Sequence, residues 1–133
     1  MTNEATLIVD TGFPVSFTVA DATGIEKGAL LKLTDPRTAS AATAGAACAG
    51  IAAVEKIAND GVTQLAVYRQ GQFKLTISGS VTVGDSLVFS SGGTNLVESA
   101  AVNSENIVGT ALETGSNAET ILVELNPRSM NLA

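Results

Sequence analysis

The stretch VTVGDSLVF at residues 81–89 decides the fold, because it sets a turn glycine in front of an alternating, β-branched strand. The stretch IEKGALLKL at residues 25–33 repeats this pattern about 56 residues earlier. Further on, GIAAVE at 50–55 loosely matches GTALE at 109–113, and TQLAVY at 63–68 matches ETILVE at 119–124. The matches predict a weak internal duplication in which each half is a small β-meander. The alternative is that short strands with glycine turns resemble one another by chance.

Outward from these stretches, alternation and β-branched content predict further short strands separated by glycine, asparagine and proline turns. The expected strands cover residues 6–9, 15–19, 29–33, 50–56, 64–68, 72–77, 86–90, 107–112 and 120–125. Short antiparallel strands at this spacing predict an all-β fold, either a small β-barrel or a β-sandwich.

The predicted organisation is a single β domain over residues 6–126, with an N-terminal arm at 1–5 and a C-terminal tail at 127–133. Both terminal arms are expected to be flexible, and Pro127 is expected to stop the last strand. The alanine-rich segment 38–49 resists the strand pattern, and we expect a mobile surface loop there in preference to a short helix.

The composition argues against most enzyme chemistry. The chain has no histidine and a single cysteine, Cys48, so the usual general base and the usual zinc ligands are missing. The acidic residues have no EF-hand spacing, and no phosphate-binding loop is present. We therefore expect a structural or recognition protein that is not an enzyme and has no metal or cofactor.

Charge and hydropathy also limit the partners. A net charge of −6 with no basic cluster disfavours nucleic acid. The apolar runs are too short to cross a bilayer, and the N-terminus lacks the features of a signal peptide. We expect a soluble, unexported protein with no membrane or nucleic-acid partner.

Two short motifs suggest catalysis. Asp10-Thr11-Gly12 resembles the active-site turn of homodimeric aspartic proteases, and Ile107-Val108-Gly109 resembles the segment behind that turn. However, Phe13-Pro14 replaces the small residue expected next, and Asp10 also fits a simple turn former. Gly84-Asp85-Ser86-Leu87 matches a lipase signature, but Ser86 has no histidine to activate it, so we interpret this motif as a β-turn that enters a strand.

Taken in order, segments along nearly the whole domain resemble the capsid decoration, or cement, proteins of tailed double-stranded DNA viruses. The segments that carry the resemblance are GIEKGALLKLTDPRTA (24–39), AGIAA (49–53), DGVT (60–63), AVY (66–68), GQF (71–73), VTVGD (81–85) and IVGTALET (107–114). The resemblance implies a β-tulip-like subunit, usually a homotrimer, at three-fold and quasi-three-fold positions on the outer capsid surface. There it would bridge neighbouring major capsid proteins and stabilise the DNA-filled head, after a stage in the host cytoplasm during assembly.

The resemblance provides no catalytic site, so the candidate residues are contacts. The N-terminal arm is expected to order on the capsid, and one way to do so is to add a strand to a sheet of the shell protein. Its candidate residues are Thr2, Asn3, Glu4, Ala5 and Thr6. Candidate trimer contacts are Val67, Tyr68, Phe73 and Phe89, for which ordinary core packing is the alternative. Two other functions stay open: a fibre, adhesin or carbohydrate-binding module, and a homodimeric aspartic protease that uses Asp10.

Overall fold

A computed structural model describes residues 3–101 and 106–129, and the prediction of an all-β fold is confirmed over these residues. The strands are β1 (Thr6–Val9), β2 (Val15–Thr18), β3 (Leu30–Asp35), β4 (Thr38–Ala41), β5 (Cys48–Ala52), β6 (Gln64–Tyr68), β7 (Gly71–Thr76), β8 (Ser86–Phe89), β9 (Val97–Ser99), β10 (Asn106–Ala111) and β11 (Thr120–Ser129).

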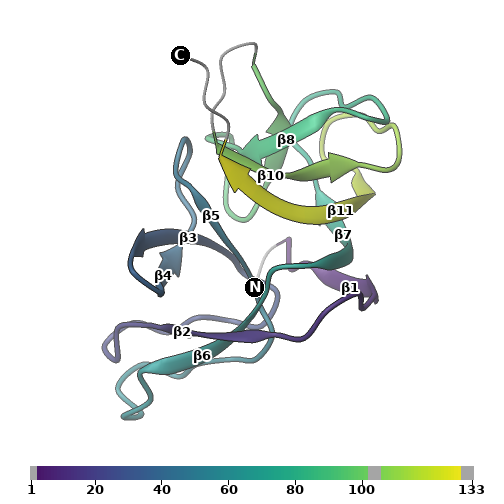
Figure 1. The fold of residues 1–133 in the computed structure, drawn as a ribbon. Coiled ribbons are helices and arrows are strands. Elements are labelled where there is room, and N and C mark those ends of the chain that lie inside the picture. The colour runs from purple at the N-terminus through teal and green to yellow at the C-terminus, as the bar shows by residue number, and fades with distance from the viewer. Residues whose placement is uncertain (1–2, 102–105, 130–133) are drawn as a thin grey trace.

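The strands form two lobes; in Figure 1, β2 to β6 run from purple to teal and β7 to β11 from teal to yellow, and purple β1 joins the second lobe beside β7. The first lobe is a closed barrel with strand order β2-β4-β3-β5-β6. The second is a six-stranded sheet with order β1-β7-β11-β10-β8-β9. A parallel bridge between Ile77 and Val97 links the end of β7 to β9, so the second sheet also curls round on itself.

The predicted duplication is confirmed by matching hydrogen bonds in the two lobes. Ile25 and Lys56 exchange backbone bonds of 2.9 and 2.7 Å, and Val81 and Gly115 exchange bonds of 3.0 and 2.9 Å at the corresponding place. Strand order agrees as well, since β4-β3-β5-β6 in the first lobe corresponds to β9-β8-β10-β11 in the second.

The turn glycines of the two copies also correspond. Gly28 and Gly84 have positive φ angles of 85° and 92°, which glycine adopts at little cost. The N–H of Gly28 donates to Ala52, and the N–H of Gly84 donates to Ala111, so each turn is fixed to the last residue of a neighbouring strand.

Strand β5 joins the hydrophobic cores of the two lobes, and each of its residues is buried. Cys48 and Ile51 pack in the larger core, which is built mainly from the second lobe, whereas Ala49 and Ala52 pack in the core of the first barrel. A register shift beside Gly50 interrupts the normal alternation and lets this strand serve both cores.

A two-stranded path connects the lobes at a second place. β1 pairs with β7 in the second lobe and β2 pairs with β6 in the first, both antiparallel. The segment 10–14 therefore crosses between the lobes beside residues 69 and 70, and a Cβ on Gly12 would touch the side chain of Gln70.

The prediction of a surface loop over residues 38–49 is wrong. Its first part is strand β4 and its end is the start of β5, and only the residues between them form a loop. Ala39 and Ala49 are buried in the first barrel, where a methyl group fits against the strands around it. Packing there overrides the helical preference of alanine.

The prediction that Pro127 stops the last strand is also wrong, because β11 continues to Ser129. Pro127 lies where the pairing with β10 shifts register, between Leu125 and Arg128. A bulge leaves a residue without a ladder partner, so the missing N–H of proline costs no hydrogen bond. Residues 130–133 of the expected tail lie outside the described residues.

Candidate functional site

The predicted trimer contacts pack inside the chain. Val67, Phe73 and Phe89 are buried, and the half-buried ring of Tyr68 packs edge-on against Phe73 with ring centroids 5.6 Å apart. Their apolar area therefore stabilises the chain's own cores and leaves little surface for a second copy.

The predicted N-terminal contacts lie beside the junction of the two copies. Thr2 lies outside the described residues, while Glu4 and Thr6 are exposed. Ala5 is buried and its N–H donates to Gly28, and the carbonyl of Asn3 accepts a bond of 2.7 Å from Asn95. Residues 3–5 thus pack on the domain, in contrast to the free arm expected from the sequence.

The two catalytic-looking motifs are turns. The Asp10 carboxylate accepts the N–H of Gly12 at 3.2 Å, and β7 and β11 separate β1 from β10, which carries Ile107 to Gly109. Asp85 accepts bonds from the N–H of Thr82 and the hydroxyl of Ser99, both at 3.0 Å. Within the described residues, no group of three histidine, cysteine, aspartate or glutamate side chains is placed to hold a metal ion, and no helix is long and apolar enough to cross a membrane.

Exposed apolar side chains lie along the part of the chain that crosses between the lobes. We call them the crossover patch, and they are Ile8, Val9, Phe13 and Val15. Phe13 is 93% exposed, beside a shallow hollow of about 260 Å³ lined by residues 10–13. An aromatic ring this exposed is unusual on a soluble monomer. The sequence signal for this patch is Phe13-Pro14, the same pair that departs from the aspartic protease turn.

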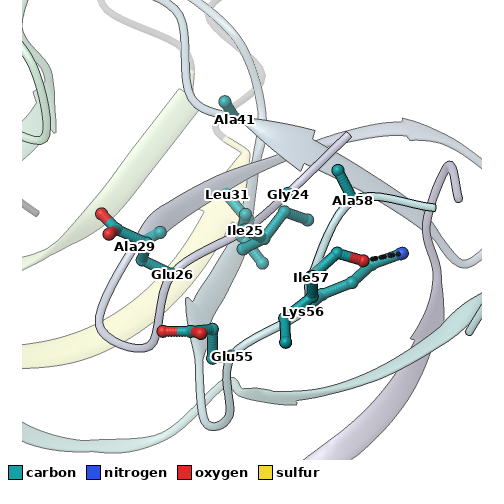
Figure 2. A pocket seen from close by; sticks show the side chains of 10 residues that line it. All are labelled: Gly24, Ile25, Glu26, Ala29, Leu31, Ala41, Glu55, Lys56, Ile57 and Ala58. Carbon is teal, nitrogen blue, oxygen red and sulfur yellow. Dashed lines mark hydrogen bonds between the residues drawn. The ribbon is translucent and has the colours of Figure 1, made fainter. Parts of the chain in front are cut away.

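A second surface lies at one end of the first barrel, and we call it the barrel-end hollow (Figure 2). It encloses about 450 Å³. Buried Ile25, Ala29 and Leu31 line it, together with the exposed side chains of Ile57 and Glu55, and Glu26 also lines it. Ile57 is 64% exposed, so the hollow combines an apolar lining with an apolar edge and two carboxylates.

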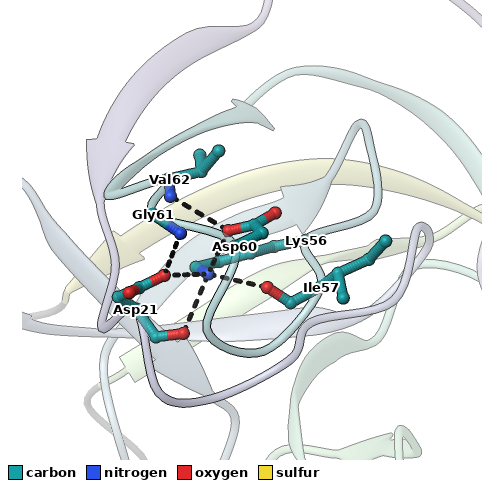
Figure 3. A network of polar contacts seen from close by, with 6 residues as sticks. All are labelled: Asp21, Lys56, Ile57, Asp60, Gly61 and Val62. Atoms are coloured by element: carbon teal, nitrogen blue, oxygen red, sulfur yellow. Dashed lines mark hydrogen bonds and ion pairs between the residues drawn. The ribbon is translucent and has the colours of Figure 1, made fainter.

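A buried lysine fixes the loop beside this hollow (Figure 3). The Nζ of Lys56 lies 3.1 Å from Asp21 Oδ1 and 2.9 Å from Asp60 Oδ1, and it donates to the carbonyls of Asp21 and Ile57, each at 3.0 Å. Asp21 Oδ1 also accepts the N–H of Gly61 at 2.8 Å. The network ties the β5–β6 loop to the loop that follows β2.

The network shifts the pKa values of Lys56 and Asp60. Burial alone would lower the pKa of Lys56, but the hydrogen bonds and charges of Asp60 and Asp21 outweigh it and raise that pKa. The bond from Lys56, with the N–H of Val62, lowers the pKa of Asp60. The ion pair therefore stays charged across the physiological range.

The second lobe has no lysine at the matching place. Gly115 stands where the first copy has Lys56, and the β10–β11 connection at 112–119 is shorter than the β5–β6 connection at 53–63. This extra length is the sequence signal that could have located the hollow. Glu113 in the shorter loop is paired with Lys74 at 2.5 Å, and this bond, with the N–H of Leu122, lowers its pKa.

Comparison with known proteins places the chain among phage proteins. A model of the phage cement protein family matches residues 9–125. The crystal structure of the N base of head fibre gp8.5 from bacteriophage phi29 aligns with a TM-score of 0.56 and 18% identity, over 88% of this chain and 98% of that chain. The search of curated proteins gave no match. At this identity the structural similarity establishes a shared fold, and the family match extends over most of the domain.

Proposed function

Since the chain belongs to the phage cement protein family, we propose that it binds the outside of an icosahedral phage head, bridges neighbouring major capsid subunits and so stabilises the DNA-filled head. Family membership supports a structural, capsid-associated role, and the family match is the observation that carries the proposal. The base of the phi29 head fibre has a similar fold.

The architecture suits a bridge between subunits. The two lobes share a core through β5 and are linked again by the paired segments at the crossover, so force on one lobe is carried to the other by packed backbone. Two exposed apolar surfaces, the crossover patch and the barrel-end hollow, lie on this body. A bridge needs at least two contact surfaces, and moderate contacts suffice when several act together.

We further propose that the protein assembles as a homotrimer and that the crossover patch is covered between copies. Cement subunits must stay soluble before they meet a head, and a ring as exposed as that of Phe13 favours aggregation unless a partner covers it. Phe13→Ser should then shift the free protein from trimer towards monomer in sedimentation velocity experiments. Wild-type protein that sediments as a monomer would refute the trimer.

Two expectations remain proposals. Exposed Glu4, which precedes β1, and exposed Thr6, the first residue of β1, stay candidates for capsid contact. The packing of Ala5 argues against a free arm at that position. We also propose that the protein has no enzymatic activity, since the Asp10 carboxylate accepts the N–H of Gly12 within its turn and the Ser86 hydroxyl accepts a hydrogen bond from Arg128.

The direct test is binding to heads of the same phage assembled without this protein. Purified protein should co-sediment with such heads at a fixed number of copies per head, and decorated heads should release DNA at a higher temperature than bare heads. Protein left in the supernatant at saturating concentration would overturn the proposal.

A further inference from the structure

The internal duplication allows the end of the first lobe that carries the barrel-end hollow to be compared with the matching end of the second lobe. Both lobes have the same bridge at this end, between Ile25 and Lys56 in one and between Val81 and Gly115 in the other. Only the first lobe has the longer loop, which carries exposed Val54, Ile57 and Val62. The longer loop and its exposed apolar side chains are therefore not required to build this kind of barrel.

The buried ion pairs mark the same end. Burying an ammonium group is costly, and such groups often contribute more to a specific conformation than to stability. Here the network of Lys56, Asp21 and Asp60 holds the longer loop in place and leaves the side chain of Ile57 exposed to solvent. Rigid display of an apolar side chain at a hollow is typical of a binding contact.

The charge at the hollow selects the kind of partner. Figure 2 shows the carboxylates of Glu26 and Glu55 on the side of the hollow away from the Lys56 ammonium, which is bound to the carbonyl of Ile57. Lys27 follows Glu26 in the chain but does not line the hollow. A partner group that lies against Glu55 is favoured if it carries positive charge.

We propose that the barrel-end hollow receives an apolar side chain of the shell protein, flanked by a lysine or arginine that pairs with Glu55. This inference rests on the proposed function, because it takes the major capsid protein as the partner. The apolar side chain would pack on Ile25 and Leu31 with Ile57 closing one edge, and the cation would lie at the mouth.

The test measures the affinity of purified protein for heads assembled without it, using Ile57→Ser and Glu55→Gln. Ile57→Ser should weaken binding by about tenfold or more, because it removes an apolar contact that becomes fully desolvated. Glu55→Gln should weaken binding by roughly threefold to tenfold and flatten the dependence of affinity on NaCl concentration. Far-UV circular dichroism and thermal melts should show both variants folded as wild type.

The second lobe supplies matched controls. Val83 is 58% exposed in the turn before β8, and Glu124 is exposed on β11, so Val83→Ser and Glu124→Gln make comparable chemical changes away from the hollow. Both controls should bind within about twofold of wild type. Two results would overturn this inference and leave the proposed function standing. In the first, the wild type binds heads and Ile57→Ser and Glu55→Gln bind them with the same affinity. In the second, the control variants lose as much affinity as these two. Failure of the wild type to bind heads would instead remove the proposed function.

Discussion

The side chain of Asn95 binds the backbone of Leu30 across the junction of the two structural copies. Asn95 lies between β8 and β9, and its Oδ1 accepts the N–H of Leu30, the first residue of β3, at 2.6 Å. Its Nδ2 donates to the carbonyls of Gly28 at 3.1 Å and Asn3 at 2.7 Å. One carboxamide thus connects the second copy, the first copy and the N-terminal segment.

Asn95→Ala should lower the free energy of unfolding by about 2 kcal/mol, because three hydrogen bonds are lost and the N–H of Leu30 loses its acceptor. Asn95→Gly is the useful comparison, since Asn95 has a φ of 59° that glycine tolerates. Both variants should be destabilised in urea unfolding, with the glycine variant less affected. Wild-type stability in both would show that the junction does not depend on this side chain.

Substitution of Gly50 or Gly109 should destabilise the protein, because at each position the backbone of a neighbouring strand lies too close for a side chain. A Cβ on Gly50 would collide with the carbonyl oxygen of Tyr68, and a Cβ on Gly109 with that of Glu124. Gly50→Ala and Gly109→Ala should each cost roughly 3 kcal/mol or more, or fail to fold. Gly45→Ala is the control, since its φ of 80° is strained but its Cβ would meet open space, and it should cost only about 1 kcal/mol. Equal stability of the three variants would contradict the close approach.

Much of the fold was predictable because its strands follow local rules. The turn glycines Gly28 and Gly84 and the alternating residues after them were sufficient to locate β3, β8 and the duplication. β4 was missed because its alanines form a strand only through burial in the barrel, and β9 because three residues are too short to show alternation. Local pattern does not report contacts between distant segments.

The candidate surfaces were less predictable than the strands. The aromatic residues expected at an interface are in the cores, because a buried and an exposed face of a strand cannot be distinguished until the partner strands are known. The barrel-end hollow depends on the meeting of Asp21 with Lys56 and Asp60, which come from two separate loops. The longer β5–β6 loop was visible in the sequence, but its ion pairs were not.

Stability should depend on pH only at the extremes. The pKa of Asp60 is lowered below its ordinary 3.8 by Lys56, and that of Glu113 below 4.5 by Lys74. Their contributions are complete above these ordinary values and are lost as the pH falls through the lowered values. The raised pKa of Lys56 gives a contribution that is complete below 10.5 and lost at higher pH.

The melting temperature should therefore be flat from about pH 5 to 8, also because the chain has no histidine to titrate there. It should fall below about pH 4.5. Glu113→Gln should melt lower than wild type at neutral pH and lose less on acidification, as measured by calorimetry. A step in melting temperature between pH 6 and 7 would be inconsistent with this assignment.

Cys48 should be inert in the native protein. Burial raises the pKa of its thiol to about 12, although the nearby charge of Arg69 opposes part of that shift. At pH 8 an aromatic disulfide reagent should label the thiol only after denaturant is added, at a rate set by unfolding. Rapid labelling of folded protein would show that β5 opens to solvent.

Electron cryomicroscopy of heads incubated with the purified protein tests the central claim most directly. The proposal predicts added density on the outer surface, shaped as two joined β lobes and contacting at least two neighbouring capsid subunits. Heads that stay bare at saturating protein, or density that contacts only one subunit, would contradict a bridging role.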